Sequence, residues 1–267
     1  MPTRRSRVKR YTTTVGSTVK KLAVTLMVDP APETNLETQH AEYVAPEPYY
    51  RDAFCTIYHG DCLDVLAWHL ADVIVTDPPY GTGGWRRTEK GAGSDPKAKL
   101  IREDWDDGAV AWLIPKPTLT FWPTARTSHL LAAANVVGLT KHRALYMQKL
   151  DPKPQVQNRI AWSVEPIWAL GPEGFQLYGG TDWFRASTPR EGRDRGATGH
   201  PYEKPVEVMR WLIDKCPPGV IADPFMGSGT TLRAAKDAGR HAIGVEADER
   251  WCEVAATRLA QEVLWVS

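Results

Sequence analysis

The sequence is poor in cysteine, and its four cysteines lie far from one another. Cys55, Cys62, Cys216 and Cys252 form no C-x-x-C pair. This spacing argues against a disulfide framework and against a cysteine-ligated zinc, so no metal site is expected. The chain also lacks an apolar run near the roughly 18 residues of a membrane span, and it opens on no signal-peptide pattern. These absences predict a cytoplasmic protein that makes no use of a membrane.

The chain carries almost no net charge, and its charge is unevenly distributed. The total is +1 over 267 residues, which by itself does not indicate a nucleic-acid partner. Residues 1–28 nevertheless hold seven Lys and Arg and no acidic residue, so the rest of the chain carries −6. Such an arm binds nucleic acid, is a solvated tail or resembles an organellar transit peptide, and all three interpretations stay open. Because residues 1–50 show no sustained hydrophobic period, we expect a basic, disordered tail.

From residue 51 onwards, strand patterns alternate with helix patterns over a single domain, 51–267. Strands are expected at 54–58, 73–76, 118–122, 142–148, 165–170, 220–222 and 241–245, and helices at 126–137, 205–215, 230–238 and 248–264. This alternation predicts an α/β fold with a mostly parallel sheet and helices on both of its faces.

The stretch VIVTDPPYG marks the end of one expected strand. Val73–Thr76 is a short apolar and β-branched run, and two prolines directly after Asp77 prevent the strand from continuing. Asp77 therefore stands at the carboxyl end of a strand, where open α/β sheets bind their ligands. A D-P-P sequence alone is equally typical of an ordinary turn.

A second motif, VIADPFMGSGTTLRAAKDAGRHAIGVEAD, has the order strand, glycine turn, helix, strand and acid. The strand ends at Asp223, the turn contains Gly227 and Gly229, and Glu246 follows the next strand. Glycines in such a turn let the backbone approach an anionic group, and an acid at this distance suits ribose hydroxyls. Leu232 replaces the third glycine of the dinucleotide fingerprint, which disfavours NAD and leaves an adenosine-type cofactor.

Together, TDPPYG and ADPFMGSGTT resemble the DNA amino-methyltransferases, which methylate adenine N6 or cytosine N4 with S-adenosylmethionine. The early D-P-P-Y and the late glycine turn resemble the circularly permuted β-group of that family. Further matches are IYHGDCLDVL at 57–66, the stretch that contains Lys149 and Glu165, and HPYEKP at His200–Pro205. The resemblance covers roughly residues 54–262 and implies a Rossmann-like methyltransferase fold in permuted motif order.

The resemblance also implies roles for residues at a cofactor site and at a catalytic site. The implied cofactor-binding residues are Asp223, Pro224, Phe225, Gly227, Ser228, Gly229 and Thr230 at the methionine part, Glu246 at the ribose, and His200 and Lys204 at the amino-acid end. The implied catalytic residues are Asp77, Pro78, Pro79 and Tyr80. His200 and Lys204 are equally compatible with capping or solvent-facing roles.

Duplex DNA is the expected partner, and basic residues in two loops are its expected contacts. They are Arg86 and Arg87 in 81–108, and Arg185, Arg190, Arg193 and Arg195 in 171–199. The resemblance makes 171–199 a short target-recognition insertion between a catalytic half, 51–170, and a cofactor half, 200–267. A solvated Arg-rich loop is the alternative interpretation.

Adenine N6 is the expected target, because family members that act on cytosine N4 mostly have Ser where this chain has Asp77. Cytosine N4 remains the nearest alternative. More remote alternatives are an RNA or protein N-methyltransferase and a DNA-binding regulator without catalysis. A homodimer and a partner restriction endonuclease are compatible with the resemblance, and the sequence leaves both open.

Overall fold

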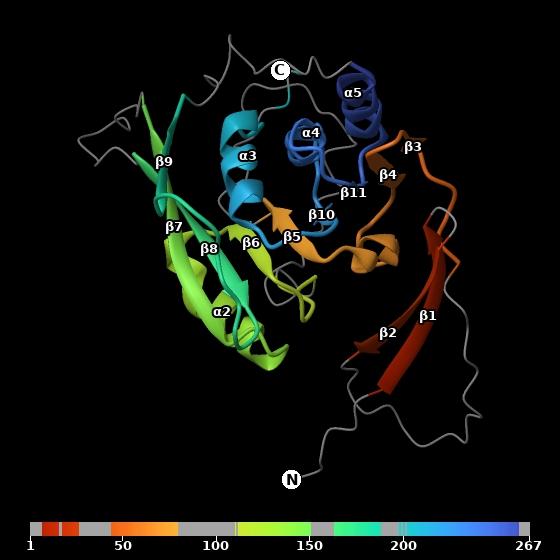
Figure 1. The fold of residues 1–267 in the computed structure, drawn as a ribbon, viewed down its shortest axis with the longest axis horizontal. Helices are drawn as coiled ribbons and strands as arrows, with labels where there is room; N and C mark the ends of the chain where they lie inside the picture. The colour runs from red at the N-terminus through yellow and green to blue at the C-terminus, as the bar shows by residue number, and fades with distance from the viewer. Residues whose placement is uncertain are drawn as a thin grey trace, which may run out of the picture.

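Among the described residues, nine strands form one mixed sheet with the order β3-β4-β11-β10-β5-β6-β8-β7-β9 (Figure 1). The computed structural model describes residues 7–15, 18–26, 44–79, 110, 112–150, 163–187, 198, 200 and 202–261. The strands are β3 (Tyr50–Arg51), β4 (Cys55–His59), β5 (Val73–Thr76), β6 (Thr118–Phe121), β7 (Lys141–Lys149), β8 (Val164–Gly171), β9 (Trp183–Ala186), β10 (Ile221–Asp223) and β11 (Ala242–Glu246). The helices are η1 (Leu66–Leu70), η4 (Thr124–Arg126), α2 (Thr127–Val136), α3 (Val206–Lys215), α4 (Thr230–Asp237) and α5 (Glu249–Ala260).

The expected α/β fold is confirmed. Every predicted strand and helix is present with its ends within two residues, except that α5 ends at Ala260. Strands β4, β11, β10, β5 and β6 run parallel to one another in this order. β3 is antiparallel to β4, and β8 is antiparallel to both β6 and β7. In the part of the chain that is described, no helix is both long enough and apolar enough to cross a bilayer.

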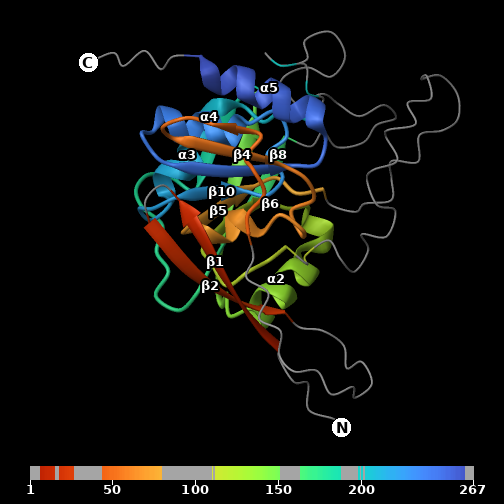
Figure 2. The same ribbon diagram turned by 90° about the vertical axis from the view of Figure 1, so that its right-hand side faces the viewer.

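The central strand β5 is buried on both faces, which explains its uninterrupted apolar sequence. Val73 and Val75 pack on the side of α3, α4 and α5, and Ile74 packs on the side of η1 and α2. Figure 2 shows α3, α4 and α5 above the sheet and α2 below it. The sheet is therefore the middle layer of three.

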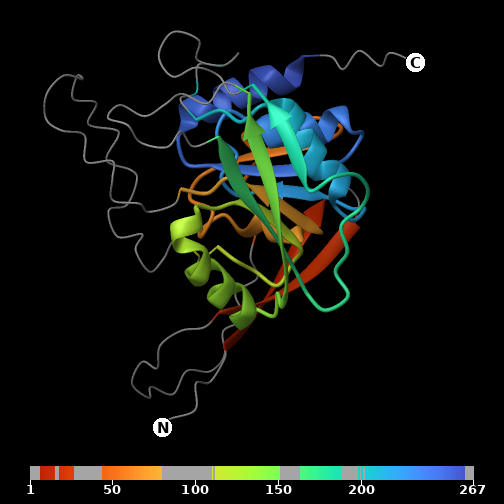
Figure 3. The ribbon, with the colours of Figure 1, turned by 90° about the vertical axis from the view of Figure 1, so that its left-hand side faces the viewer.

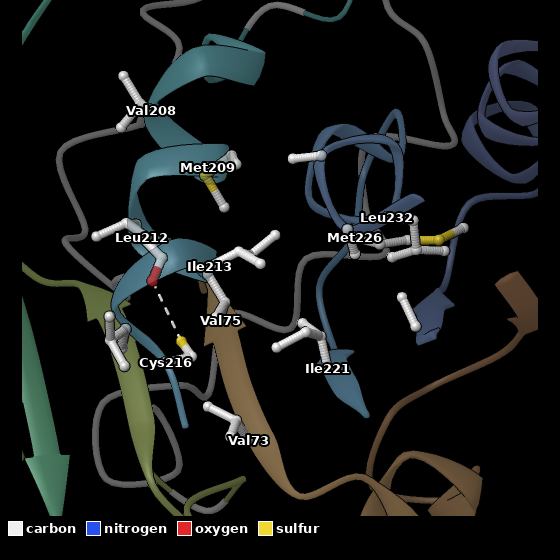
Figure 4. Packing of buried hydrophobic residues seen from close by; sticks show 14 of the residues in the cluster. Val73, Val75, Val208, Met209, Leu212, Ile213, Cys216, Ile221, Met226 and Leu232 are labelled. Carbon is white, nitrogen blue, oxygen red and sulfur yellow. Dashed lines mark hydrogen bonds between the residues drawn. The ribbon is translucent and has the colours of Figure 1, made fainter. Parts of the chain in front are cut away.

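Helix α3 covers β5 and β10 with the apolar face that the sequence predicts. Met209, Leu212 and Ile213 are almost fully buried, and they meet Val75 of β5 and Ile221 of β10 (Figure 4). This packing fixes the start of α3, and with it the segment directly before the helix, over the carboxyl ends of the two strands.

Residues 7–26 correct the prediction of a disordered tail. β1 (Arg7–Val15) and β2 (Thr18–Leu26) form a separate antiparallel sheet in which Val15 lies opposite Thr18. The sequence does carry the signal, because β-branched residues flank Gly16-Ser17, a two-residue connection typical of hairpins. Frequent basic residues interrupt this β-branched pattern, so it does not stand out as two strands.

The expected recognition insertion also contains structure that the sequence did not predict. β9 pairs in parallel with β7, so that Trp183 lies beside Tyr146, and Figure 3 shows the two strands next to each other. Phe184 turns inward and packs against Trp211 of α3, with ring centroids 5.6 Å apart. The first part of 171–199 is thus an edge of the main sheet.

Candidate active site at the carboxyl ends of β5 and β10

The two Asp-Pro motifs end neighbouring parallel strands. Ile221 of β10 lies beside Val73 of β5, and Asp223 and Asp77 follow at the same edge of the sheet (Figure 1). The chain leaves β5 towards β6 on one side, and it leaves β10 towards β11 on the other. Such a reversal opens a crevice in which α/β proteins bind ligands.

The carboxylate of Asp223 is directed into the protein. It accepts hydrogen bonds from Thr76 Oγ1 at 2.6 Å, from the Phe225 N–H at 3.0 Å and from Thr231 Oγ1 at 2.5 Å. The residue is only 3% exposed. Asp223 therefore joins β5, the glycine turn and α4, and the sequence did not predict the two threonine donors.

Burial raises the pKa of Asp223 to about 6, and the nearby charge of Asp77 adds to the increase. The donors of Thr231, Thr76 and Phe225 favour the ionised form and oppose the rise. No cation is among these causes, which explains why burial prevails.

The turn after β10 requires glycine at two positions. Gly227 and Gly229 have φ values of 51° and 77°, in the left-handed region that other residues rarely adopt. A Cβ on Gly229 would also lie 2.7 Å from the Cβ of Ala255 in α5. Next to this turn, Ser228 and Thr230 are buried, and α4 begins with its free N–H groups at the crevice.

Glu246 closes the crevice at the end of β11. Its carboxylate accepts the N–H of Gly227 at 3.0 Å and the N–H of Asp248 at 2.8 Å. Burial raises its pKa, and these two backbone donors oppose the rise. Each carboxylate oxygen can accept more than one hydrogen bond, so Glu246 can shape the turn and still accept hydroxyl groups.

The segment before α3 brings Lys204 to Asp77. The Lys204 ammonium lies 3.1 Å from Asp77 Oδ2 and 3.0 Å from Glu165 Oε2, and it stands 4.5 Å from the centroid of the Phe121 ring. Burial alone would lower the pKa of Lys204, but the two carboxylates outweigh burial and raise it. The residue expected at the cofactor is therefore held by the predicted catalytic aspartate.

The same segment is fastened to the glycine turn through an ion pair that the sequence did not reveal. Glu203 pairs with Arg258 of α5, and both side chains are at least nine-tenths buried. Arg258 also donates to the Ser228 carbonyl at 3.1 Å and to Thr230 Oγ1 at 2.8 Å. Since Arg258 belongs to an amphipathic helix, its position in the sequence gives no sign of this contact.

His200 lies against Gly227, where its Nε2 would be 3.3 Å from an added Cβ. Its Nδ1 accepts the Tyr202 N–H at 3.2 Å, and its ring meets Trp251 edge-on at 4.4 Å. Burial lowers the pKa of His200, which favours the neutral ring. A neutral ring that accepts at Nδ1 carries its proton on Nε2, so it presents a donor to the turn.

The remaining predicted residues are placed only in part. Pro78 and Pro79 follow Asp77 at the crevice, and Pro224 and Phe225 open the glycine turn, with Phe225 edge-on to Trp112 at 5.9 Å. Arg185 is exposed on β9 and donates to Gln148 Oε1 at 2.9 Å. Outside the described residues lie Tyr80, Arg86, Arg87, Arg190, Arg193 and Arg195. No cluster of His, Cys, Asp and Glu suited to a metal occurs in the described ranges.

Comparison with known proteins identifies the family of this chain. The DNA methylase family model (N6/N4 type) matches residues 165–257. The Type II methyltransferase M.ScaI of Streptomyces caespitosus is 43% identical to this chain, in an alignment that covers 81% of this chain and 84% of the relative. The chain belongs to the N6/N4 DNA methylase family.

Another sequence relative and two solved structures are also similar to this methylase. The Type II methyltransferase M2.LlaDCHI of Lactococcus lactis subsp. cremoris is 24% identical, over 84% of this chain and 96% of the relative. A structure of M1.HpyAVI with SAM superposes with a TM-score of 0.54 and 23% identity, over 78% of this chain and all of the other. The structure of the cytosine-N4-specific PvuII DNA methyltransferase superposes with a TM-score of 0.57 and 16% sequence identity, over 82% of this chain and 90% of the other.

As a member of this family, the methylase uses S-adenosylmethionine, and the crevice fits that cofactor. Gly227 and Gly229 allow the turn to pack closely against His200 and Ala255, and the N-terminus of α4, whose N–H groups suit an anionic group, begins there. Glu246 offers acceptors for ribose hydroxyls, and the carboxylates of Glu246 and Asp77 suit a cofactor that bears a sulfonium and an ammonium.

The buried carboxyl of Asp223 predicts a pH dependence of stability. Its pKa is about 6 in the folded chain against an ordinary value of 3.8, so the folded state binds this proton more tightly. The resulting stabilisation is complete below about pH 4 and is lost as the pH rises through about 6. Asp223→Asn cannot ionise. The free energy of unfolding of the wild type relative to this variant should therefore fall by roughly 1–3 kcal/mol between about pH 4 and pH 7.

Urea unfolding of both proteins at the two pH values measures this difference. An equal difference at both pH values would contradict the burial-raised pKa of Asp223.

Proposed function

We propose that this methylase transfers a methyl group to N6 of an adenine in duplex DNA, with Asp77 and the Pro78 carbonyl at the target amine. One observation carries the proposal. Asp77, held by Lys204 at 3.1 Å, shares an edge of the sheet with the glycine turn, and Thr76 joins the two motifs through Asp223. Acceptor and cofactor turn therefore face one crevice.

The chemistry follows from the weak nucleophilicity of a nucleobase amine, whose lone pair is delocalised into the ring. Asp77 and the Pro78 carbonyl can accept hydrogen bonds from its two N–H groups and so favour a tetrahedral nitrogen as it attacks. When bound, S-adenosylmethionine supplies an electrophilic methyl group. The contribution of the chain is then mainly to hold the amine in line with that group.

The residues at the cofactor are those of the turn and its surroundings. Gly227, Gly229 and the start of α4 would take the methionine part, and Glu246 would take the ribose hydroxyls. His200, which presents its Nε2 proton at Gly227, would donate to the cofactor carboxylate.

Asp77 supports adenine as the target, because in this family Asp or Asn at the first motif position goes mainly with adenine and Ser with cytosine. Cytosine N4 is the second candidate. It is supported by the PvuII enzyme, a cytosine-N4-specific methyltransferase with the same fold. Two acceptors at Asp77 and Pro78 would serve either amine.

A target base inside a duplex has to be extruded before its amine can reach Asp77, at a cost of a few kcal/mol. Tyr80 is proposed to offset part of this cost by stacking on the base. Arg185 and the predicted arginines of the two loops are proposed to contact the DNA. The Type II relatives support a specific target sequence and a partner restriction endonuclease.

The target base can be identified directly. DNA from cells that express the protein is digested to nucleosides, which are separated by mass spectrometry, with DNA from cells that express Asp77→Ala as the control. N6-methyladenine that depends on Asp77 is the expected product. N4-methylcytosine without N6-methyladenine would make cytosine N4 the target instead of adenine N6. The absence of both methylated nucleosides would contradict the proposed activity.

Asp77→Ala should lower kcat at least about 100-fold, because the target amine loses its side-chain acceptor. Cofactor affinity should stay within about threefold, since the glycine turn and Glu246 are untouched. Calorimetry and tritium transfer from labelled cofactor measure the two effects. The exposed, surface-paired Asp214 supplies the control Asp214→Ala, which should behave as wild type. Parallel losses of cofactor binding and kcat would contradict the role given to Asp77.

A further inference from the structure

Four charged side chains form a continuous series of ion pairs at the edge of the sheet where Asp77 lies. Lys204 contacts Asp77 at 3.1 Å and Glu165 at 3.0 Å, and Lys149 contacts the other Glu165 oxygen at 2.6 Å. The four residues come from four places in the chain: after β5, before α3, the start of β8 and the end of β7. Two carboxylates and two ammonium groups cancel in charge.

This series is better shielded from water than an ordinary surface pair. The side chains of Lys149, Glu165 and Lys204 are 25%, 27% and 17% exposed. At the opposite end of β7, Lys141 pairs with Glu173, and these side chains are 52% and 79% exposed. Water and salt screen the second pair far more strongly, so the first series has the greater influence on side-chain position.

Within the series, Glu165 anchors the Lys204 ammonium beside Asp77, because it binds the same ammonium at 3.0 Å. Lys149 holds the second oxygen of Glu165 at 2.6 Å and so keeps the Glu165 carboxylate in place. Without Lys149, Glu165 could turn and carry the ammonium away from Asp77. Burial opposes the ionised form of Glu165, but Lys204 and Lys149 outweigh burial and lower its pKa, so both contacts operate between charged groups.

We propose that Glu165 and Lys149 are positioning residues for Asp77, and that both act through Lys204. The contact of Lys204 with Oδ2 fixes the rotation of the Asp77 carboxylate and thereby the direction of Oδ1. This inference rests on the proposed function only in that it takes Asp77 as the acceptor at the target amine.

The test compares Lys149→Met, Lys149→Arg, Glu165→Gln, the double variant Lys149→Met with Glu165→Gln, and Asp77→Ala. Lys141→Met is the matched control, because Lys141 lies in the same strand as Lys149 and forms an exposed ion pair with Glu173. Tritium transfer to mixed-sequence duplex DNA gives kcat, calorimetry gives the dissociation constant of S-adenosylhomocysteine, and thermal unfolding reports on the fold. Total tritium counts methylation of either base, so an error in the assignment of adenine does not alter the readout.

We expect Lys149→Met to lower kcat on the order of tenfold and Glu165→Gln up to about 100-fold, with unchanged cofactor affinity. Lys149→Arg should recover most of the activity, and Lys141→Met should match the wild type. Since Lys149 acts through Glu165, the double variant should lose no more than Glu165→Gln alone.

Wild-type kcat in Lys149→Met and Glu165→Gln, with Asp77→Ala inactive, would overturn the inference and leave the proposed function standing. Full activity of Asp77→Ala would overturn both. Additive losses in the double variant, or equal losses of kcat and cofactor affinity, would show a merely structural role and also overturn the inference.

Discussion

The hydrogen bond from Thr76 to Asp223 joins two motifs that are 147 positions apart in the sequence. It is buried, and it lies between neighbouring strands whose ends form the crevice. Because Thr76 directly precedes Asp77, and Asp223 also holds Phe225 and Thr231, a shift of either motif would disturb the other. The rest of the site is built around this contact.

Several carboxylates lie at this edge of the sheet. The segment before α3 provides Lys204, which pairs with both Asp77 and Glu165, and Glu203, which pairs with Arg258. Arg258 also contacts the glycine turn. Among the described residues, the donors to Asp223 are neutral groups, and burial raises its pKa. The packing of α3 on β5 and β10 thus positions charges as well as apolar surface (Figure 4).

The sequence predicts those features of the fold that depend on local patterns. Val73–Thr76 is recognisable because a doubly buried strand is apolar throughout, and Gly227 and Gly229 are recognisable because the turn needs positive φ. β9 is not recognisable, because it is a four-residue strand with alternate residues exposed. The hairpin at 7–26 was missed because basic residues obscured a valid turn signal.

The sequence nominates the residues of the candidate site, but it does not predict their contacts. Asp77, Glu246 and the glycine turn follow from motif and position. The contact of Lys204 with Asp77, and that of Arg258 with Ser228, depend on long-range packing of α3 and α5, which no local pattern encodes.

A crystal structure of the protein with S-adenosylhomocysteine tests most directly the claim that both motifs face one crevice. The account predicts the cofactor over Gly227 and Gly229, its ribose hydroxyls at Glu246 and its sulfur directed towards Asp77. A cofactor bound elsewhere, for example in the apolar cavity of about 510 Å³ lined by Tyr178, Val220 and Arg240, would contradict it. So would a sulfur turned away from Asp77.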